Sequence, residues 1–316
     1  MTIKKKSIHR IHPWQSKPLI LKTNYLEKKA LWTMVMPVFN QADKLNEILL
    51  KVRQNASLPF EIIFINDGSS DRTLECLQKI CSTLNLKDNN KIVSSTIIHN
   101  EFPIFETACD NQGFRLAQTE YIIEIQSDIH IEEQDFDQKM ICAMKKYNFS
   151  TLSGRHIHNF SLLDSNNPWT KYPLLLMKWR ILKIGSESFG KIGKKIFQKE
   201  KCQPDDCYIG ETVSRGPWLI KKSDLQNYDY LDEKNFFLGN DDHDFNRKLY
   251  ENEKRNSGYI PLNIYSVAED GSTRKKRHGI NKKIYDFLKK KKKGSLGYIN
   301  FLRDYKPYCK IQKLTN

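Results

Sequence analysis

Four consecutive side chains that can exchange protons stand within the segment FLGNDDHDFNRKLY, residues 237–250. They are Asp241, Asp242, His243 and Asp244. A carboxylate can act as a general base, and a second carboxylate beside it raises its pKa towards neutrality. The same acids also suit the first turn of a helix, where the macrodipole stabilises negative charge. The segment alone leaves both interpretations open, and the choice depends on the elements around it.

The chain from residue 31 to about 145 alternates between strand and helix patterns. Its strands are continuous apolar runs rich in β-branched and aromatic residues, and its helices have apolar residues at a spacing of three or four. The predicted strands are 31–40, 60–67, 91–100 and 120–131, and the predicted helices are 42–55, 71–84 and 106–118. Strands that are apolar on both faces predict an α/β fold, with a mostly parallel central sheet covered by helices on both faces.

Polar residues follow three of these strands. Asn40 ends the first strand, Asp67 ends the second, and Asp128 and His130 end the fourth. Ligands of parallel α/β sheets gather at the carboxyl ends of the strands. The pattern therefore predicts one polar crevice at that edge of the sheet.

The turn NDGSSD, residues 66–71, has two interpretations. The carboxylate of Asp67 can accept hydrogen bonds from the N–H or hydroxyl groups of a ligand, while Gly68 lets the backbone turn tightly beside it. Alternatively, the segment is an ordinary turn that caps the next helix through Ser70 or Asp71.

The second half of the chain has a weaker pattern. We expect loops and one or two helices over 150–210, including a buried or interfacial helix over 172–185. Further on, the pattern predicts a strand that enters a turn over 212–225, a helix over 241–255 and a strand over 257–267.

The net charge of +15 is concentrated at the two ends of the 316-residue chain. Residues 1–30 hold eight Lys and Arg against one Glu, and residues 266–316 hold fifteen against four acids, whereas 31–265 hold 29 against 32. The basic ends, above all the run of five lysines at 289–293, either attract an anionic membrane surface or only keep the protein in solution. A nucleic-acid partner is not expected, because the middle of the chain is slightly acidic.

Composition also predicts the compartment. No apolar run is long enough to span a membrane, and no apolar signal core follows the basic N-terminus. The seven cysteines are odd in number and scattered, and the close pair Cys202 and Cys207 lacks a second pair of zinc ligands. We expect reduced thiols in a cytoplasmic protein that can lie peripherally at the inner membrane face.

Four segments, taken in order, resemble the family 2 glycosyltransferases, which have the A-type nucleotide-sugar transferase fold. They are VMPVFN, EIIFINDGSSDRT, NQGFRLAQTEYIIEIQSD and GNDDHDFNRK. The resemblance implies a Rossmann-like nucleotide-sugar-binding half over 31–150, joined to an acceptor-binding and catalytic-base half over 151–267. A basic N-terminal extension over 1–30 and a basic C-terminal tail over 268–316 would flank the two halves.

The resemblance also implies a donor site. Asp67 would bind the nucleotide beside Gly68, and Pro37, Val38 and Asn40 would line the same pocket. Asn111 and Arg115 would lie near the phosphates, although Arg115 can equally pair with Glu120.

The family's paired metal-binding acids align with Gln126, Ser127 and Asp128, so the first acid is missing here. Asp128 would hold a divalent cation, and His130 would be an additional ligand. The ion would be Mn²⁺ or Mg²⁺, with Mn²⁺ favoured if an imidazole takes part.

For the transfer step, the resemblance places Asp242 as the general base of an inverting reaction, with Asp241 adjusting its pKa. Asp244 and Arg247 would pair along the helix. His243 would contact the acceptor or lie at the surface. Two residues outside the segment have two interpretations each. Trp218 either stacks on a sugar ring or packs in the core. His278 is either a ligand of the metal or a phosphate, or part of a solvated basic loop.

The implied activity is transfer of a sugar from a nucleotide-sugar donor to a glycan or a lipid-linked acceptor. Two alternatives remain open. A catalytically impaired relative would fit the loss of the acid at Gln126. A nucleotidyltransferase would need a glycine-rich phosphate loop after the first strand, and VFNQADK, residues 38–44, lacks one.

Overall fold

A computed structural model describes most of the chain. The described residues are 17–84, 91–162, 179–189, 195–197, 205–213, 215–267 and 277–314. The predicted pair Cys202 and Cys207 lies partly outside them, and so do residues 172–178 of the predicted helix.

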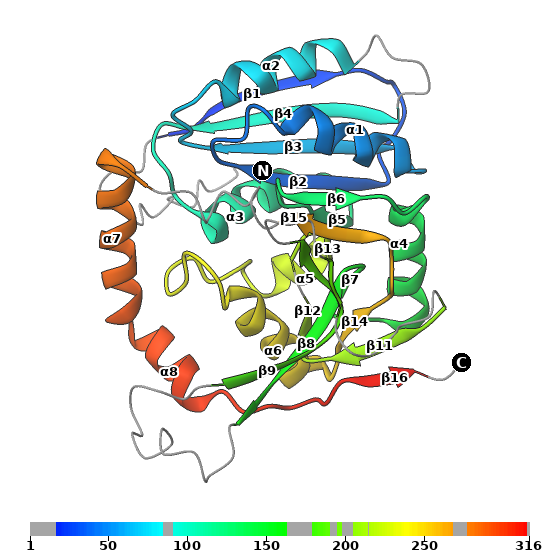
Figure 1. The fold of residues 1–316 in the computed structure, drawn as a ribbon, viewed down its shortest axis with the longest axis vertical. Helices are drawn as coiled ribbons and strands as arrows, with labels where there is room; N and C mark the ends of the chain where they lie inside the picture. Colours follow the sequence, from blue (N-terminus) through cyan, green and yellow to red (C-terminus); the bar gives the residue numbers. More distant parts are fainter. Residues whose placement is uncertain are drawn as a thin grey trace, which may run out of the picture.

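A ten-stranded sheet forms the centre of the molecule, and its first half is the predicted parallel sheet (Figure 1). Four strands pair in parallel in the order β4, β3, β2, β5. Their bounds are Trp32–Val38 for β2, Phe60–Asp67 for β3, Ile92–Asn100 for β4 and Tyr121–Glu124 for β5. An additional strand within the predicted N-terminal extension, β1 (Leu19–Asn24), pairs antiparallel with β4 at the sheet edge.

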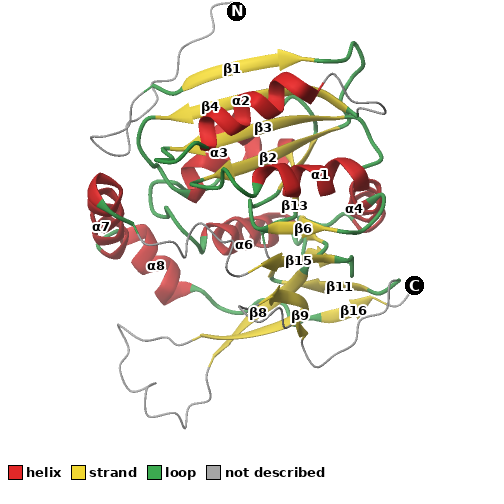
Figure 2. Ribbon diagram, turned by 45° about the horizontal axis from the view of Figure 1, so that its top comes forward, coloured by secondary structure: helices red, strands yellow, loops and turns green. Residues whose placement is uncertain are grey.

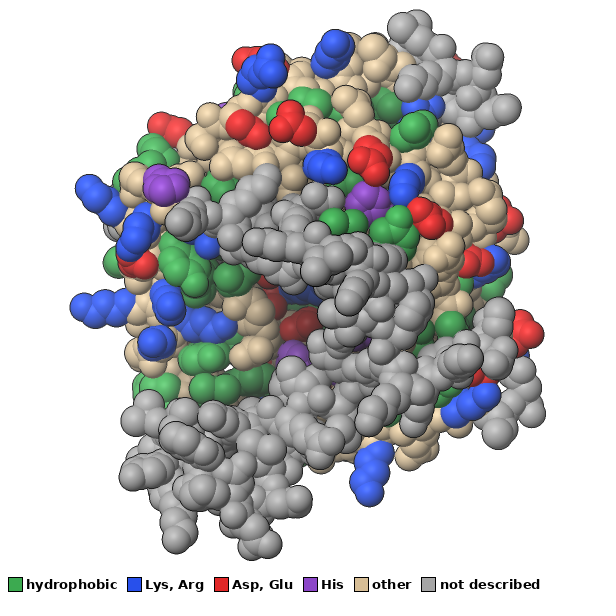
Figure 3. All heavy atoms as spheres, viewed as in Figure 1, with side chains coloured by type: hydrophobic (Ala, Val, Ile, Leu, Met, Phe, Trp, Pro, Cys, Tyr) green, Lys and Arg blue, Asp and Glu red, His purple; other side chains and the backbone are tan. Residues whose placement is uncertain are grey.

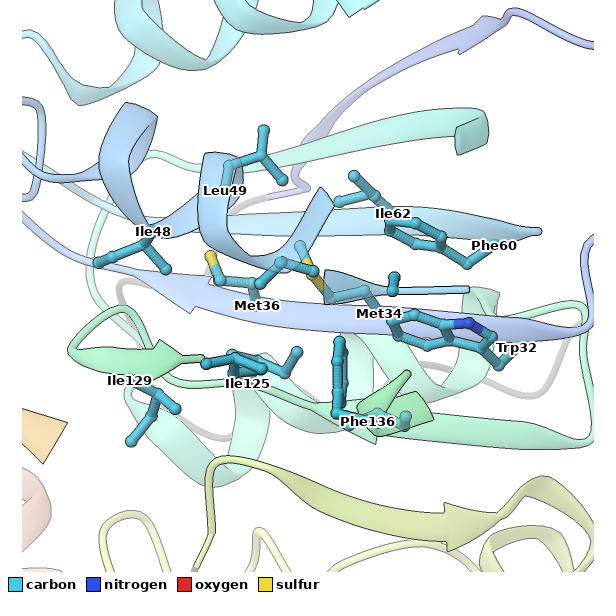
Figure 4. Packing of buried hydrophobic residues seen from close by; sticks show 14 of the residues in the cluster. Trp32, Met34, Met36, Ile48, Leu49, Phe60, Ile62, Ile125, Ile129 and Phe136 are labelled. Carbon is cyan, nitrogen blue, oxygen red and sulfur yellow. The ribbon is translucent and has the colours of Figure 1, made fainter. Parts of the chain in front are cut away.

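Helices cover both faces of this parallel part, as the sequence predicts. Alternate residues of β2 point to opposite faces. Met34 and Met36 belong to the core cluster that contains Ile48 of α1, and Figure 4 shows this packing. Val35 belongs to a second cluster with Phe114 of α3. The helices are α1 (Leu45–Asn55), α2 (Thr73–Thr83), α3 (Glu106–Leu116) and α4 (Phe136–Tyr147).

The same sheet continues across the predicted boundary at residue 150. Beyond β5 the order is β13, β7, β14, β11, β16, and among these strands only β7 and β14 pair in parallel. Their bounds are Trp218–Lys221 for β13, Thr151–Ser153 for β7, Ser257–Tyr259 for β14, Cys207–Gly210 for β11 and Gln312–Leu314 for β16. The two predicted halves therefore share one sheet.

A second sheet has the order β12, β8, β9, β15, β6, with β10 paired to β9. Its strands are β6 (Ile129–Ile131), β8 (His156–Leu162), β9 (Trp179–Phe189), β10 (Lys195–Phe197), β12 (Thr212–Val213) and β15 (Ile264–Val267). The predicted helix over 172–185 is wrong in its described part, because residues 179–185 lie in β9. A short apolar run interrupted by basic residues does not distinguish helix from strand by periodicity.

Three predicted strands are each divided between the sheets. The strand over 120–131 forms β5 and β6, and the strand over 257–267 forms β14 and β15. The strand over 212–225 forms β12 and β13, and its last residues begin a helix at Lys222. The division after β5 creates the turn that carries residues 126–128, at the carboxyl edge of the parallel sheet.

The described residues of the C-terminal part of the chain form four further helices. They are α5 (Lys222–Asn227), α6 (Asp241–Glu253), α7 (Gly279–Lys293) and α8 (Leu296–Asp304). Figures 1 and 2 both show α7 and α8 one after the other along one flank of the molecule. The described part of the predicted C-terminal tail is therefore folded onto the body. No helix in the described ranges combines the length and the apolar character needed to cross a bilayer.

Candidate active site

A cavity of about 300 Å³ opens where the strands of the parallel sheet end. Five of the residues predicted for the donor site line it, namely Pro37, Val38, Asp67, Ser127 and Asp128. The rest of the lining is Phe39, Pro103, Phe105, Glu106, Cys109, Glu124, Gln126, Leu238, Gly239, Arg277 and Asn281. The cavity thus combines three strand ends with loops and with the start of α7.

Asp67 is fixed at this cavity by backbone donors. Its Oδ1 accepts a hydrogen bond from Ile104 N at 2.6 Å, and its Oδ2 accepts one from Phe105 N at 3.0 Å. Burial raises the pKa of Asp67 to about 6, while these bonds oppose the shift. Each carboxylate oxygen has a further lone pair, so the group can still accept a bond from a ligand.

Gly68 allows the turn that carries Asp67. Its φ is +63°, and a Cβ at this position would lie 2.6 Å from the backbone carbon of Phe102. Only glycine fits both the left-handed conformation and this close approach. Gly68 does not line the cavity itself.

Three other predicted donor-site residues lie outside the cavity lining. Asn40 accepts a bond from Ser70 N at 2.8 Å and so stabilises the turn after β3. Asn111 exchanges bonds with the backbone of Leu231, at 2.8 and 3.0 Å. Arg115 lies 3.5 Å from Glu233 rather than pairing with Glu120. These side chains have structural partners that the sequence pattern did not reveal.

Asp128 and His130 are not brought together as the sequence suggested. Asp128 lines the cavity and accepts a bond from Ser266 Oγ at 3.1 Å. His130 lies in β6, where its ring stacks on Tyr265 with centroids 5.3 Å apart and its Nδ1 is 3.7 Å from Glu47. The chain turns at residues 127–128, so the two side chains do not continue along one strand. His130 does not line the cavity, so it gives no reason to prefer Mn²⁺ over Mg²⁺ there.

The fit of a divalent cation depends on Asp128. Within the described ranges, no three His, Cys, Asp or Glu side chains are grouped so that they could hold a metal ion. Magnesium-type ions, however, commonly use one or two carboxylates together with substrate phosphates and water. Asp128 provides one such carboxylate at the cavity, so the residues fit a cation that is shared with a diphosphate.

A buried arginine connects the cavity to the start of α6. Arg215, 6% exposed, forms ion pairs with Asp110 and Asp241, and lies 3.4 Å from Glu106. Burial lowers the pKa of Arg215, but the three carboxylates outweigh it and hold the pKa well above its ordinary value. Arg215 therefore stays charged and anchors acids from α3 and α6.

Glu124 is a fully buried acid in the cavity lining. Its Oε2 accepts a bond from Gly216 N at 3.1 Å, and its Oε1 has no hydrogen-bond partner among the residues that the structure describes. Burial, together with Asp110, raises the pKa of Glu124 well above its ordinary value. Glu106 likewise has a raised pKa, mainly through burial, and it accepts a bond from Gln126 Nε2 at 2.7 Å.

The acidic segment of α6 starts the helix and also has the electrostatics of a proton acceptor. Asp241 is fully buried against Arg215, whereas Asp242 is only partly buried. Burial raises the pKa of Asp242 to about 6, and Asp241 adds a smaller increase. Asp242 does not line the cavity, whereas Glu106 does. The two groups are close enough to interact, because the charges of Asp241 and Asp242 both raise the pKa of Glu106. Both interpretations of the segment are therefore compatible.

His243, Asp244 and Arg247 of α6 have partners within the protein. His243 is buried, with its Nε2 at 3.0 Å from Nε2 of His158, and burial lowers its pKa to about 3. It is not the surface residue that one interpretation suggested. Asp244 and Arg247 pair at 3.3 Å along the helix, as predicted.

Trp218 packs in the core and does not face the cavity. It is fully buried, and its ring makes edge contacts with Phe114 and Phe245 at 6.5 and 6.2 Å between centroids. His278 is exposed at the start of α7 and is not in the cavity lining, whereas its neighbour Arg277 is.

Sequence reasoning missed Glu106, Glu124, Arg215, Arg277 and Asn281. Two of them left a signal, because Glu124 interrupts the apolar strand YIIEI and Arg215 precedes the apolar strand GPWLI. A charged residue in such a run is rarely buried without a partner. Arg277 and Asn281 left none, since they reach the cavity from a segment far along the chain.

Comparison with known proteins gives one family. Residues 33–200, more than half of the chain, match the model described as "Glycosyl transferase family 2". The chain is 31% identical over 109 residues to a poly-beta-1,6-N-acetyl-D-glucosamine synthase of Staphylococcus aureus, a match that covers 34% of this chain and 24% of the synthase. It is 27% identical over 136 residues to an uncharacterized glycosyltransferase of Haemophilus influenzae, covering 40% of this chain and 51% of that protein. The chain thus spans between a quarter and about half of these relatives' lengths.

Among solved structures, GalNAc-T7 with UDP, GalNAc and Mn²⁺ aligns with a TM-score of 0.53 at 12% identity, over 77% of this chain and 45% of that one. A mannosyltransferase of Pyrobaculum calidifontis with GDP-Man and Mn²⁺ aligns with a TM-score of 0.48 at 12% identity, over 78% and 58%. At such identities the GalNAc-T7 match concerns the fold alone, and it agrees with the A-type glycosyltransferase fold.

Proposed function

The chain belongs to glycosyltransferase family 2, and from this premise we propose that its cavity binds a nucleotide-sugar donor and transfers the sugar with inversion to a hydroxyl acceptor. The observation that carries the proposal is the convergence of Asp67 and Asp128 at one cavity, from the ends of two strands that are not neighbours in the chain. This is where ligands of such sheets bind.

Asp67 would accept hydrogen bonds from the base or the ribose of the nucleotide. Its two backbone donors hold the carboxylate in one orientation, so binding a ligand costs little reorganisation. Pro37 and Val38 give the cavity an apolar wall against which a flat base can pack. Asn40 and Gly68 contribute by fixing the two turns, and Asn111 and Arg115 are left out of the proposed donor contacts.

Asp128 would hold a divalent cation, Mg²⁺ or Mn²⁺, together with the diphosphate of the donor. When bound, such a cation neutralises the negative charge that develops on the leaving diphosphate. Ser266 fixes the Asp128 carboxylate through its hydroxyl. The side chain of Gln126 is bonded to Glu106, so it would orient that acid in the lining and take no direct part as a ligand.

Asp242 would be the general base. Its carboxylate accepts the proton of the acceptor hydroxyl while the oxygen forms a bond to the anomeric carbon, and the bond between that carbon and the diphosphate breaks on the opposite face. A pKa near 6 leaves Asp242 ionised at neutral pH and still basic enough to take the proton. Asp241 acts mainly through Arg215, which anchors the first turn of α6.

Calorimetric titration of nucleoside diphosphates tests the donor site. UDP and GDP are each titrated with and without Mn²⁺. We expect at least one of them to bind the wild-type protein and to bind the Asp67→Ala variant at least tenfold more weakly. The matched control is Asp71→Ala, which alters the same turn at a position outside the cavity lining. Binding that is equal in wild type and Asp67→Ala would contradict the proposal.

The synthase from Staphylococcus aureus makes a polymer of N-acetyl-D-glucosamine, as its name states. The synthase matches only 109 residues of this chain, or 34% of its length. N-Acetylglucosamine is therefore the first donor sugar to test, and the acceptor is a glycan or a lipid-linked sugar.

A further inference from the structure

Helix α7 forms part of the wall of the proposed donor site. Asn281 in its first turn lines the cavity, and so does Arg277 just before it. Further along, Ile284 and Leu288 are buried in a cluster with Phe105 and Phe237. This inner face is therefore fully used in packing and in the cavity.

Another face of α7 combines exposed apolar and basic side chains. Ile280 is 41% exposed and Phe287 is 39% exposed. Lys283 and Lys291 are also exposed, and the four residues follow one another at intervals of three or four. Residues with this spacing lie along one side of a helix. The result is a row in which apolar and basic side chains alternate.

Helix α8 continues the exposed apolar character. Leu296 is 75% exposed and Ile299 is 40% exposed. Leu296 follows α7 after a turn of two residues, Gly294 and Ser295. In Figure 3, Lys and Arg side chains gather along the flank where Figure 1 places α7, with hydrophobic side chains among them. We call Ile280, Lys283, Phe287, Lys291, Leu296 and Ile299 the α7–α8 surface.

The charge of α7 selects the kind of partner. The helix holds seven lysines and one acid, Asp286, which is paired with Lys282 at 2.7 Å. Such a helix attracts anionic surfaces, and the attraction is limited to about a Debye length. A nucleic-acid backbone would use the lysines but would leave the exposed aliphatic side chains in water. Aliphatic and aromatic side chains beside lysines match the boundary between lipid headgroups and acyl chains.

We propose that the α7–α8 surface docks on an anionic lipid bilayer. Docking would place the cavity beside the membrane, and the acceptor would then be a lipid-linked sugar. This statement about the acceptor deepens the proposed function and rests on it. The link to the catalytic segment is direct. Lys292 of α7 donates hydrogen bonds to the carbonyl oxygens of Leu238 and Gly239, at 2.9 and 3.0 Å, and these two residues both line the cavity.

Vesicle co-sedimentation of the full chain tests the surface. We expect binding to vesicles of equal parts phosphatidylcholine and phosphatidylglycerol, weakened by salt, and no binding to phosphatidylcholine alone. The charge variant replaces Lys283, Lys290 and Lys291 by Ser. Each lysine should contribute about fivefold, so the variant should bind about a hundredfold more weakly.

Two further variants separate charge from apolar contact. The control variant replaces the exposed Lys22 of β1, Lys28 and Lys79 of α2 by Ser. It removes the same charge outside α7 and α8, and it should bind like wild type. The apolar variant, Phe287→Ser with Leu296→Ser, should bind at least tenfold more weakly although its charge is unchanged. Melting temperatures equal to that of wild type show that each variant is folded.

Three results would overturn the docking proposal. They are no binding of wild type to anionic vesicles, equal losses in the charge and control variants, or wild-type affinity in the apolar variant. If any of these results is found and the wild-type protein binds a DNA duplex, the lysines serve a nucleic-acid partner instead. Nucleoside diphosphate titration of the same samples reports the donor site separately, so failure of docking and failure of the proposed function are distinguishable.

Discussion

Arg215 and Asp241 form a buried ion pair between the loop before β13 and the first turn of α6. The same guanidinium also pairs with Asp110 of α3. One side chain therefore pairs with acids from two helices, α3 and α6, and it anchors the helix turn that carries Asp242.

Arg215→Met should destabilise the protein strongly. Removing the cation leaves buried carboxylates without a partner, which typically costs about 3–5 kcal/mol. Burial already raises the pKa values of Asp110 and Glu106, and Arg215 opposes that rise. Without Arg215 these two pKa values rise further in the folded state, so the loss of stability should be large at neutral pH and smaller in acid, where the groups are protonated. Urea unfolding across pH measures it.

The control for this prediction is Arg303→Met, which removes an exposed arginine paired with Asp304. An exposed pair contributes little, and no change in unfolding midpoint is expected. Equal midpoints for Arg215→Met and wild type would show that Arg215 does not stabilise the acid cluster.

The raised pKa of Asp242 predicts the pH dependence of transfer. A general base must be ionised, so kcat/KM should rise tenfold per pH unit below about 6 and level off above it. Asp242→Asn should lower kcat by about 10²–10⁴ and remove this acid limb. Initial rates of nucleoside diphosphate release over the pH range measure both effects. An unchanged limb in Asp242→Asn would assign the base to another group.

Gly68→Ala should destabilise the turn that positions Asp67. The positive φ alone costs a residue with a Cβ about 1–2 kcal/mol, and the contact at 2.6 Å with the Phe102 backbone adds to that. Gly279→Ala is the matched control, since its φ is +54° and a Cβ there meets nothing within 4 Å. Thermal unfolding should show the larger loss at Gly68. The turn would have to be looser than described if both substitutions cost the same.

Asp128→Asn should weaken cation-dependent donor binding about tenfold or more, because the amide loses the charge that attracts the ion. His130→Gln should leave that binding unchanged, since His130 stacks on Tyr265 away from the cavity lining. Titration of a nucleoside diphosphate with and without Mn²⁺ compares the two variants. If nucleotide binding by His130→Gln no longer depends on Mn²⁺, His130 is a metal ligand and this prediction is wrong.

The sequence predicted the parts of the site that come from regular alternation. Asp67, Ser127 and Asp128 line one cavity because parallel strands end at one edge, and that rule needs no tertiary detail. Arg277 and Asn281 could not be predicted, because their approach depends on how α7 packs against Phe105 and Phe237. The bond between Asn111 and Leu231 could not be predicted for a similar reason, since the two residues lie 120 positions apart in the chain.

The measurement that tests the central claim most directly is release of nucleoside diphosphate from a panel of nucleotide sugars, beginning with UDP-N-acetylglucosamine, by wild type and by Asp242→Asn. We predict that wild type turns over at least one donor, and that Asp242→Asn binds that donor with similar affinity but releases the diphosphate at least a hundredfold more slowly. No turnover or binding of any donor by wild type, or equal rates in the two proteins, would contradict the account.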